Sequence, residues 1–192
     1  MIICIVGKSG SGKSYICKLL KSYSTNILHL DIDIIGHQVL LIPDVINNLV
    51  NTFGESILYK DSIDRKALAK IVFNSEEQMN KHIEITWKYM ELLIDEYISK
   101  HKDNIILLDW QLLPKTKYFS SSDLSILINA PFEQRKQKVI DRDHLNEDAF
   151  LLREKASYDF DNLKFDYIIN NDYSNNIKEK VREIYDKSII SR

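Results

Sequence analysis

The 192-residue sequence is short of several residue types: it has five glycines, three prolines and two cysteines. Two cysteines without a spaced framework exclude a disulfide-stapled scaffold. No apolar run approaches the roughly 20 residues that a helix needs to span a bilayer. The formal net charge of −2, from 26 basic and 28 acidic residues, lacks the basic excess that is typical of nucleic-acid-binding domains. We therefore expect neither a membrane nor a nucleic acid as the partner.

The remaining composition is that of a globular protein, with 44% hydrophobic and 28% charged residues. Cys4 and Cys17 fall in apolar or helical segments and are predicted to be buried free thiols, as in a reducing compartment. Met1 leads directly into an apolar segment, residues 2–6, without a basic leader or a cleavage site, so we expect no secretory signal. Residues 1–192 are predicted to form one monomeric domain in the cytoplasm.

Five short and nearly continuous apolar segments are predicted to be strands that are covered on both faces. They are residues 2–6, 27–30, 105–108, 124–128 and 167–169. Stretches with helical spacing separate them. This alternation predicts an α/β fold, an open parallel sheet of about five strands in three layers with helices on both faces. Ligands of such sheets bind at the carboxyl ends of the strands.

Four helices have recognisable signals. Residues 75–100 and the segment after Tyr173 place apolar side chains at helical spacing. Asp64 is predicted to be the N-cap of a helix, and Pro131 to occupy the first position of another.

A full phosphate-loop motif follows the first predicted strand. Residues 7–14, Gly-Lys-Ser-Gly-Ser-Gly-Lys-Ser, match G-x-x-x-x-G-K-[ST] and precede a run compatible with a helix. Such a loop points backbone N–H groups at phosphate oxygens, and the helix adds its positive N-terminal end. Lys13 is predicted to neutralise the β- and γ-phosphates of ATP, and the Ser14 hydroxyl to ligate Mg²⁺. The predicted nucleotide contacts are Gly7, Lys8, Ser9, Gly10, Ser11, Gly12, Lys13, Ser14 and Tyr15.

Acidic residues follow the second and third predicted strands. Asp33 is predicted to be a general base that accepts the proton of an attacking hydroxyl and orients it toward the γ-phosphate. Asp31 fits a helix cap as well as a functional role. Asp109 is predicted to hold Mg²⁺ through water, and a capping carboxylate is an alternative of nearly equal weight.

A basic cluster precedes Asp143. Arg135, Lys138 and Arg142 are spaced by three and four residues, which places them on one helical face. Phosphoryl transfer needs cations that surround the transferred group when a lid closes, and Arg142 is predicted to be such a lid residue. For the lysines, a solvated helix face is an equal alternative. The five histidines show no metal-ligand spacing, and none is assigned.

These segments resemble the dephospho-CoA kinase family over most of the chain. After the phosphate loop, residues 31–35, Asp-Ile-Asp-Ile-Ile, are similar to the family's D-A-D-x-I segment. Arg65 begins a pattern that resembles R-x-x-L-x-x-x-[IV]-F. Arg142-Asp143 matches the lid arginine segment, and residues 165–171 look like the late A-D-x-V-I-x-N-[ND] strand.

The resemblance implies a phosphate-loop fold of the nucleoside-monophosphate-kinase type with a helical lid. It implies an ATP- and Mg²⁺-dependent enzyme that phosphorylates the ribose 3′-hydroxyl of dephospho-CoA, the last step of coenzyme A synthesis. By the same resemblance, Asp33 is the base, Arg65 belongs to the acceptor site and Arg142 is a lid cation over the ATP phosphates. The acceptor-binding helical region would span about 34–101, and the lid about 131–157.

The chain departs from the family pattern at several positions. Lys8 stands where a second glycine is usual, and His37 where an arginine is usual. Residues 84–88 lack the family's His-Pro, and residues 110–115 lack the proline and the acid of P-L-L-[FY]-E. Two alternatives therefore stay open: a kinase for another nucleoside, nucleotide or small alcohol, and an ATP-binding protein that has lost turnover.

Overall fold

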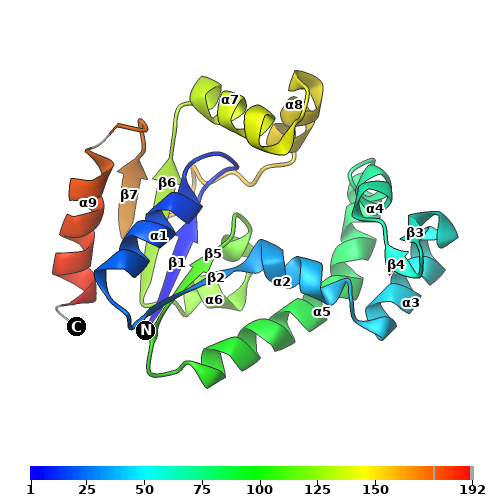
Figure 1. Ribbon diagram of the computed structural model, residues 1–192, viewed down its shortest axis with the longest axis horizontal. Helices are drawn as coiled ribbons and strands as arrows, with labels where there is room; N and C mark the ends of the chain where they lie inside the picture. The colour runs from blue at the N-terminus through cyan, green and yellow to red at the C-terminus, as the bar shows by residue number, and fades with distance from the viewer. Residues whose placement is uncertain (175, 191–192) are drawn as a thin grey trace. The chain divides into compact units, whose positions relative to one another are not determined.

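The computed structural model describes residues 1–174 and 176–190. The chain divides into two compact units. The first comprises residues 1–31 and 102–192, and the second comprises residues 32–101. Figure 1 shows the parallel sheet of the first unit and the helices of both.

The sheet of the first unit has five parallel strands in the order β2-β5-β1-β6-β7. The strands are β1 (Ile2–Val6), β2 (Ile27–Asp31), β5 (Ile105–Asp109), β6 (Leu124–Asn129) and β7 (Tyr167–Asn170). All five predicted strands are confirmed, and four of them extend one residue further at the carboxyl end. Asp31 and Asp109 are register partners at that end of β2 and β5.

Helices cover both faces of this sheet. On one face, α1 (Lys13–Tyr23) and α9 (Ile177–Ile184) pack against the strands, and a π-helical turn (Tyr185–Ile189) continues α9. Their apolar side chains share a core with alternate residues of the strands, among them Ile3, Ile5, Leu107, Ile126 and Ile128. On the other face lies the short α6 (Lys117–Ser120), where the thiol of Cys4 donates to the carbonyl of Tyr118 at 3.7 Å. Both cysteines are free and buried, as predicted.

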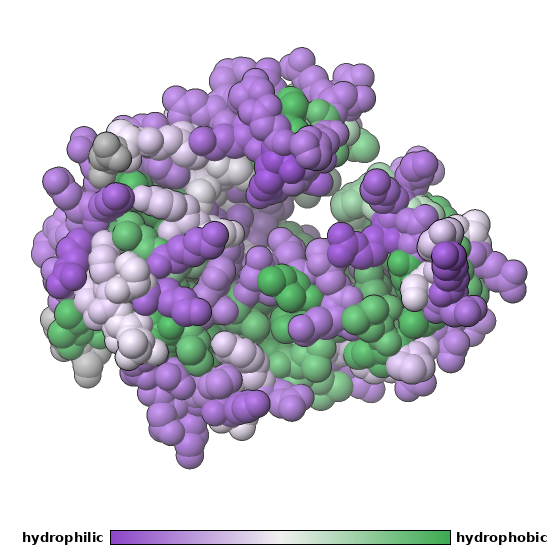
Figure 2. Space-filling model, viewed as in Figure 1, coloured by the Kyte–Doolittle hydropathy of each residue, from purple (hydrophilic) through white to green (hydrophobic). Residues whose placement is uncertain are grey.

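Two helices, α7 (Phe132–Asp143) and α8 (Glu147–Lys155), follow β6 within the range predicted to be a lid. Phe132 and Phe150 join them through an edge-to-face contact with ring centroids 5.7 Å apart. Pro131 is the N-cap of α7, not its first helical residue as predicted. Its ψ of 138° is extended, so the helix begins one residue later. The visible surface of these helices is mostly hydrophilic (Figure 2).

The second unit is helical apart from one small hairpin. It contains α2 (Ile32–Val39), α3 (Pro43–Phe53), α4 (Arg65–Val72) and α5 (Glu76–Lys100), and the first three pack on α5. Asp64 caps α4 as predicted, accepting from the amides of Lys66 at 2.9 Å and Ala67 at 3.1 Å. Between α3 and α4, a 3-10 turn (Glu55–Ile57) leads into an antiparallel pair, β3 (Leu58–Tyr59) and β4 (Ser62–Ile63), which was not predicted. Within the described residues, no helix is long and apolar enough to cross a membrane.

Candidate active site

The phosphate-loop residues connect β1 to α1 and need glycine at two close approaches. Gly7 has φ 151°, and a Cβ there would lie 2.4 Å from the carbonyl oxygen of Ile128. Gly12 has φ 96°, and its Cβ would lie 2.4 Å from Nδ2 of Asn171. Gly12 is also the N-cap of α1 and, as glycine, offers no side chain to satisfy the first amides of the helix. These amides are therefore available to an anion.

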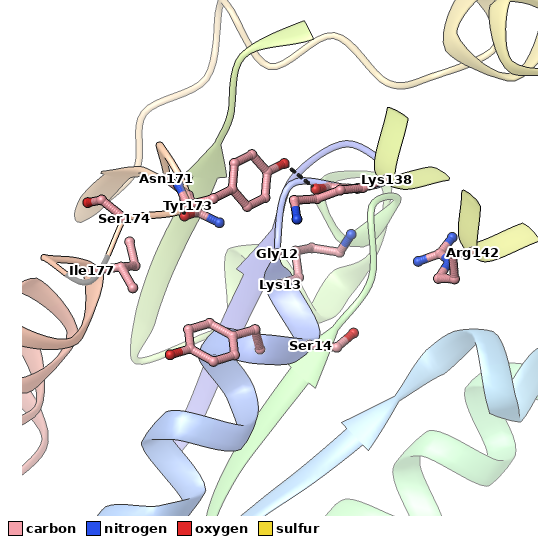
Figure 3. A pocket seen from close by; sticks show the side chains of 11 residues that line it. Gly12, Lys13, Ser14, Lys138, Arg142, Asn171, Tyr173, Ser174 and Ile177 are labelled. Atoms are coloured by element: carbon pink, nitrogen blue, oxygen red, sulfur yellow. Dashed lines mark hydrogen bonds between the residues drawn. The ribbon is translucent and has the colours of Figure 1, made fainter. Parts of the chain in front are cut away.

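Residues that follow β7 hold the loop in this shape (Figure 3). The buried amide of Asn171 donates from Nδ2 to the carbonyl of Ser11 at 2.8 Å. The hydroxyl of Tyr173 donates to the carbonyl of Gly10 at 2.5 Å, and its backbone amide donates to Oδ1 of Asn171 at 2.9 Å. The asparagine falls in the segment that resembles the family's late strand, but no sequence signal pointed to Tyr173.

A cavity of about 430 Å³ lies beside the loop, within the size range of small-ligand sites. Three cations line it: Lys13 from the start of α1, and Lys138 and Arg142 from α7 (Figure 3). The Nζ of Lys138 lies 4.4 Å from the ring centroid of Tyr173. The remaining lining residues are Gly10, Gly12, Ser14, Tyr15, Asn171, Tyr173, Ser174 and Ile177. This mixture of cations and loop backbone suits a polyphosphate.

The two residues predicted to support Mg²⁺ are in contact. Oγ of Ser14 donates to Oδ2 of Asp109 at 3.1 Å. Asp109 is 3% exposed at the carboxyl end of β5, and Nε2 of His29 lies 3.3 Å from the same carboxylate oxygen. A hydroxyl and a carboxylate beside a phosphate loop are the hard oxygen ligands that Mg²⁺ prefers, so the residues present fit this ion.

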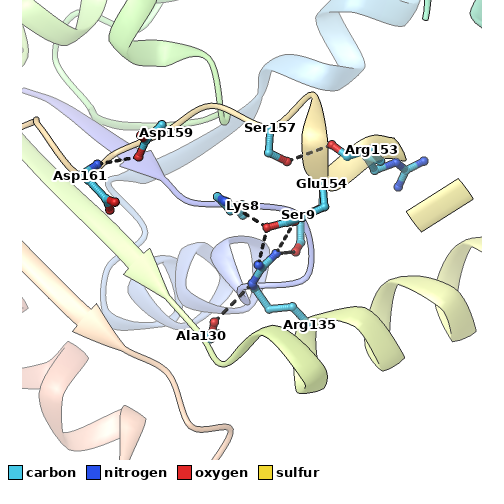
Figure 4. A network of polar contacts seen from close by, with 9 residues as sticks. All are labelled: Lys8, Ser9, Ala130, Arg135, Arg153, Glu154, Ser157, Asp159 and Asp161. Carbon is cyan, nitrogen blue, oxygen red and sulfur yellow. Dashed lines mark hydrogen bonds and ion pairs between the residues drawn. The ribbon is translucent and has the colours of Figure 1, made fainter. Parts of the chain in front are cut away.

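Two other loop residues take part in a charged network with the helices that follow β6 (Figure 4). Glu154 of α8 accepts two hydrogen bonds from the guanidinium of Arg135, at 2.9 and 2.8 Å, and one from Lys8 at 3.0 Å. Arg135 also donates to the carbonyls of Ser9 and Ala130. The hydrogen bonds from Arg135, and then that from Lys8, hold the pKa of Glu154 below its usual value despite partial burial. We call Lys8, Arg135 and Glu154 the loop clamp.

Arg135 therefore differs from Lys138 and Arg142 of the same helix. Helical spacing placed it on one face with Lys138 and Arg142, yet it is buried in the loop clamp and does not line the cavity. Arg142 does line the cavity, and its guanidinium donates to both carboxylate oxygens of Asp143, at 2.7 and 2.9 Å. The Arg142 hydrogen bonds, with Arg153 adding to them, lower the pKa of Asp143 to about 2.

The two residues predicted for the acceptor side lie in the second unit. Asp33 is exposed in the first turn of α2, two residues beyond the last residue of β2. Arg65 is the exposed first residue of α4, directly after the Asp64 cap. Their roles stay predictions.

Comparison with known proteins identifies the family. The dephospho-CoA kinase family pattern matches residues 1–178. A dephospho-CoA kinase from Aquifex aeolicus is 32% identical over 194 residues, covering 96% of each chain. The chain belongs to the dephospho-CoA kinase family. A dephospho-CoA kinase from Thermus thermophilus is 28% identical over 156 residues, which cover 81% of this chain and 74% of that one.

Solved structures agree in fold with this member of the dephospho-CoA kinase family. A crystal structure of a Thermus thermophilus protein has a TM-score of 0.82 at 25% identity, covering 95% of this chain and 94% of that one. A dephospho-CoA kinase from Campylobacter jejuni has a TM-score of 0.62 at 20% identity, covering 97% and 96%. The predicted α/β phosphate-loop fold and family resemblance are confirmed. Membership implies an ATP-dependent kinase with dephospho-CoA as the acceptor.

Proposed function

We propose that this chain transfers the γ-phosphoryl group of Mg·ATP to the ribose 3′-hydroxyl of dephospho-CoA in the cytoplasm, as a monomer. The observation that carries the proposal is the cavity at which Lys13, Lys138 and Arg142 converge on the N-terminus of α1. An acyl or glycosyl transfer would have no use for three cations beside a phosphate loop. A triphosphate carries negative charge on many oxygens, and three cations beside the loop would neutralise that charge.

Each cation has a distinct proposed role in this cavity. Lys13, which follows Gly12 at the start of α1, neutralises the β- and γ-phosphates. Lys138 and Arg142 come from α7 and stabilise charge on the transferred group, where Arg142 serves as the catalytic lid cation. The range 131–157 would act as the lid that excludes water from the reacting phosphate.

Ser14 and Asp109 would hold Mg²⁺, Ser14 directly through Oγ and Asp109 through water. When bound, Mg²⁺ supplies charge neutralisation to the β- and γ-phosphate oxygens. The 3.1 Å hydrogen bond between the two side chains keeps the hydroxyl of Ser14 oriented toward the carboxylate. Asp109 is buried at the strand end, beside the loop.

The second unit would supply the acceptor side, with residues 34–101 as the acceptor-binding region. Asp33 accepts the proton of the 3′-hydroxyl as the new O3′–Pγ bond forms. The bond between Pγ and the β–γ bridging oxygen breaks, and ADP leaves. Arg65 would bind an anionic group of dephospho-CoA. Support for both roles comes from their match to the family segments and from the position of Asp33 just past β2.

The test combines two readouts in one incubation. Purified protein is mixed with ATP and Mg²⁺, with and without dephospho-CoA, and ADP release and CoA mass are followed together. We expect ADP and CoA in equal amounts, only when dephospho-CoA is present. Release of ADP with a different nucleoside or alcohol, and none with dephospho-CoA, would assign another acceptor. Tight ATP binding with no acceptor-dependent ADP would show a lapsed enzyme.

Matched variants separate the roles. Lys13→Ala should lower kcat/KM by about 10² or more, whereas Lys18→Ala, at an exposed position of the same helix, should not. Asp33→Asn should remove most of the kcat while ATP binding is retained. Asp44→Asn, an exposed acid in the first turn of α3, is its control. Full activity in Asp33→Asn would refute the assignment of the base.

A further inference from the structure

A cluster of three potential metal ligands, a thiol, an imidazole and a carboxylate, lies beneath the phosphate loop. Cys17 of α1, His29 of β2 and Asp109 of β5 each offer one ligand atom, and the three atoms lie within 4.8 Å of one another. Cys17 and Asp109 are both buried, and His29 is partly so. The cluster was not visible in the sequence, because its members come from three distant segments.

The ligand types match Zn²⁺ better than Mg²⁺. Zinc binds thiolate, imidazole and carboxylate in tetrahedral sites, and three protein ligands leave a fourth position for water or another oxygen. Zinc–nitrogen and zinc–oxygen bonds of about 2.0–2.1 Å place two tetrahedral ligand atoms roughly 3.3 Å apart. Nε2 of His29 and Oδ2 of Asp109 are 3.3 Å apart. Mg²⁺, by contrast, prefers hard oxygen ligands in an octahedron.

We propose that Cys17, His29 and Asp109 form a binding site for Zn²⁺ or a similar borderline divalent ion, and that this ion inhibits the kinase by binding Asp109. The inhibitory part rests on the proposed function, in which Asp109 supports Mg²⁺ with Ser14. The two sites would share one carboxylate, and Ser14 already contacts it at 3.1 Å. When zinc occupies its site, Asp109 is therefore no longer available to support Mg²⁺ beside the phosphates.

Binding exchanges a proton for the metal at Cys17. The thiol proton passes to solvent, and a bond forms between Sγ and the ion. Burial, reinforced by the nearby Asp109 carboxylate, raises the pKa of the Cys17 thiol well above its usual value. A divalent ion at this position compensates both the thiolate and the carboxylate.

The site can be tested without any turnover. The nucleotide-free full chain is titrated with Co²⁺, which reports a thiolate ligand through a charge-transfer band in the near ultraviolet. We expect one Co²⁺ per chain, displacement by an equimolar amount of Zn²⁺, and no displacement by excess Mg²⁺. Absence of the band in the unmodified chain would overturn the proposal.

Two pairs of variants locate the ligands. Cys17→Ala should abolish the band, and Cys4→Ala, at the other buried thiol, should preserve it. His29→Gln should weaken Co²⁺ binding, while His101→Gln at the end of α5 should not. A band that persists in Cys17→Ala and disappears in Cys4→Ala would refute the assignment. If Cys17→Ala fails to fold, the comparison of His29→Gln with His101→Gln tests the assignment instead, and equal Co²⁺ binding by the two variants would refute it.

Inhibition is measured last, as the dependence of ADP formation on free Zn²⁺ at fixed Mg²⁺. Each variant is compared with its own zinc-free rate. Cys17→Ala should need a much higher Zn²⁺ concentration for half inhibition than the unmodified chain does. Equal sensitivity would refute the inhibitory role. A chain that binds Co²⁺ but forms no ADP would keep the metal site and reject the proposed function instead.

Discussion

The loop clamp allows a quantitative prediction, the effect of Glu154→Gln on stability. The Glu154 side chain is 15% exposed and its partner Arg135 is 6% exposed, whereas Lys8 is 35% exposed. The substitution preserves shape and one acceptor oxygen but removes the negative charge. A buried guanidinium is then left without its counter-charge, next to a lysine of the same sign.

The magnitude follows from the burial of each partner. Removing one member of a buried ion pair costs about 3–5 kcal/mol. The cost here falls at or below the bottom of that range, because the amide can still accept one bond and Arg135 keeps its hydrogen bonds to the carbonyls of Ser9 and Ala130. The lysine is about a third exposed, so its contribution is below about 1 kcal/mol. We expect Glu154→Gln to lower the free energy of unfolding by about 2–3 kcal/mol.

Urea denaturation measures this change, with Glu147→Gln as the control. Glu147 lies on the same helix and pairs with Lys136, but its side chain is 62% exposed, so its loss should cost about 0.5 kcal/mol or less. A double-mutant cycle with Arg135→Met should return a coupling energy of about 1–3 kcal/mol. The reasoning is refuted if Glu154→Gln costs no more than Glu147→Gln.

The contribution of Glu154 to stability should depend on pH. The pKa of Glu154 is lowered in the folded chain, so its stabilisation is complete above the usual glutamate pKa of about 4.3. It is lost as the pH falls through the lowered folded pKa. The difference in unfolding free energy between the unmodified chain and Glu154→Gln should therefore be constant near neutral pH and should shrink below about pH 4. A difference that grows on acidification would contradict the clamp.

Three further changes test other parts of the structure. Gly12→Ala should lower the affinity for ATP at least tenfold, as measured by calorimetry. The added Cβ would clash with Asn171 at a φ of 96° and strain the loop by about 1–3 kcal/mol. Unchanged affinity would show that the shape of the loop does not matter for ATP binding. Lys138→Ala should lower kcat/KM for ATP several-fold, because it removes charge stabilisation from the transferred group, and Lys136→Ala on the same helix is its control in the same assay. Asp64→Ala should cost about 1 kcal/mol in thermal unfolding through loss of the α4 cap, without altering ATP affinity.

The strands and the phosphate loop were predictable because their signals are local. A continuous apolar run such as residues 2–6 identifies a strand covered on both faces, whatever its neighbours. The G-x-x-x-x-G-K-[ST] spacing reflects the geometry of the loop directly. Gly7 and Gly12 occupy positions where a Cβ would clash with neighbouring atoms, so the motif places glycine there. Asp64 was predictable as a cap for the same reason, because its partners are the amides two and three residues further along the chain, in the first turn of α4.

The parts that were missed depend on backbone choices or on distant partners. The β3–β4 hairpin turns at Lys60 and Asp61, which have φ values of 48° and 61°. Hairpin turns with positive φ are usually predicted from glycine or asparagine, so the lysine gave no signal for this turn. Arg135 was grouped with the cavity cations because its carboxylate partner, Glu154, comes from the next helix, and helical spacing cannot show that pairing. Pro131 was misplaced by one residue, because proline's fixed φ suits both the cap and the first helical position.

The position of β1 in the middle of the sheet has a consequence for synthesis of the protein on the ribosome. Its register pairs Ile2 with Ile106 on one side and Ile3 with Leu124 on the other. At typical elongation rates, roughly five seconds or more pass between emergence of the first strand and that of its neighbours. During that interval its apolar side chains have no sheet to enter, and Gly7 has no Ile128 carbonyl to approach. A nascent chain therefore becomes able to bind a nucleotide only late in synthesis, and ATP cannot guide the earlier steps of its folding.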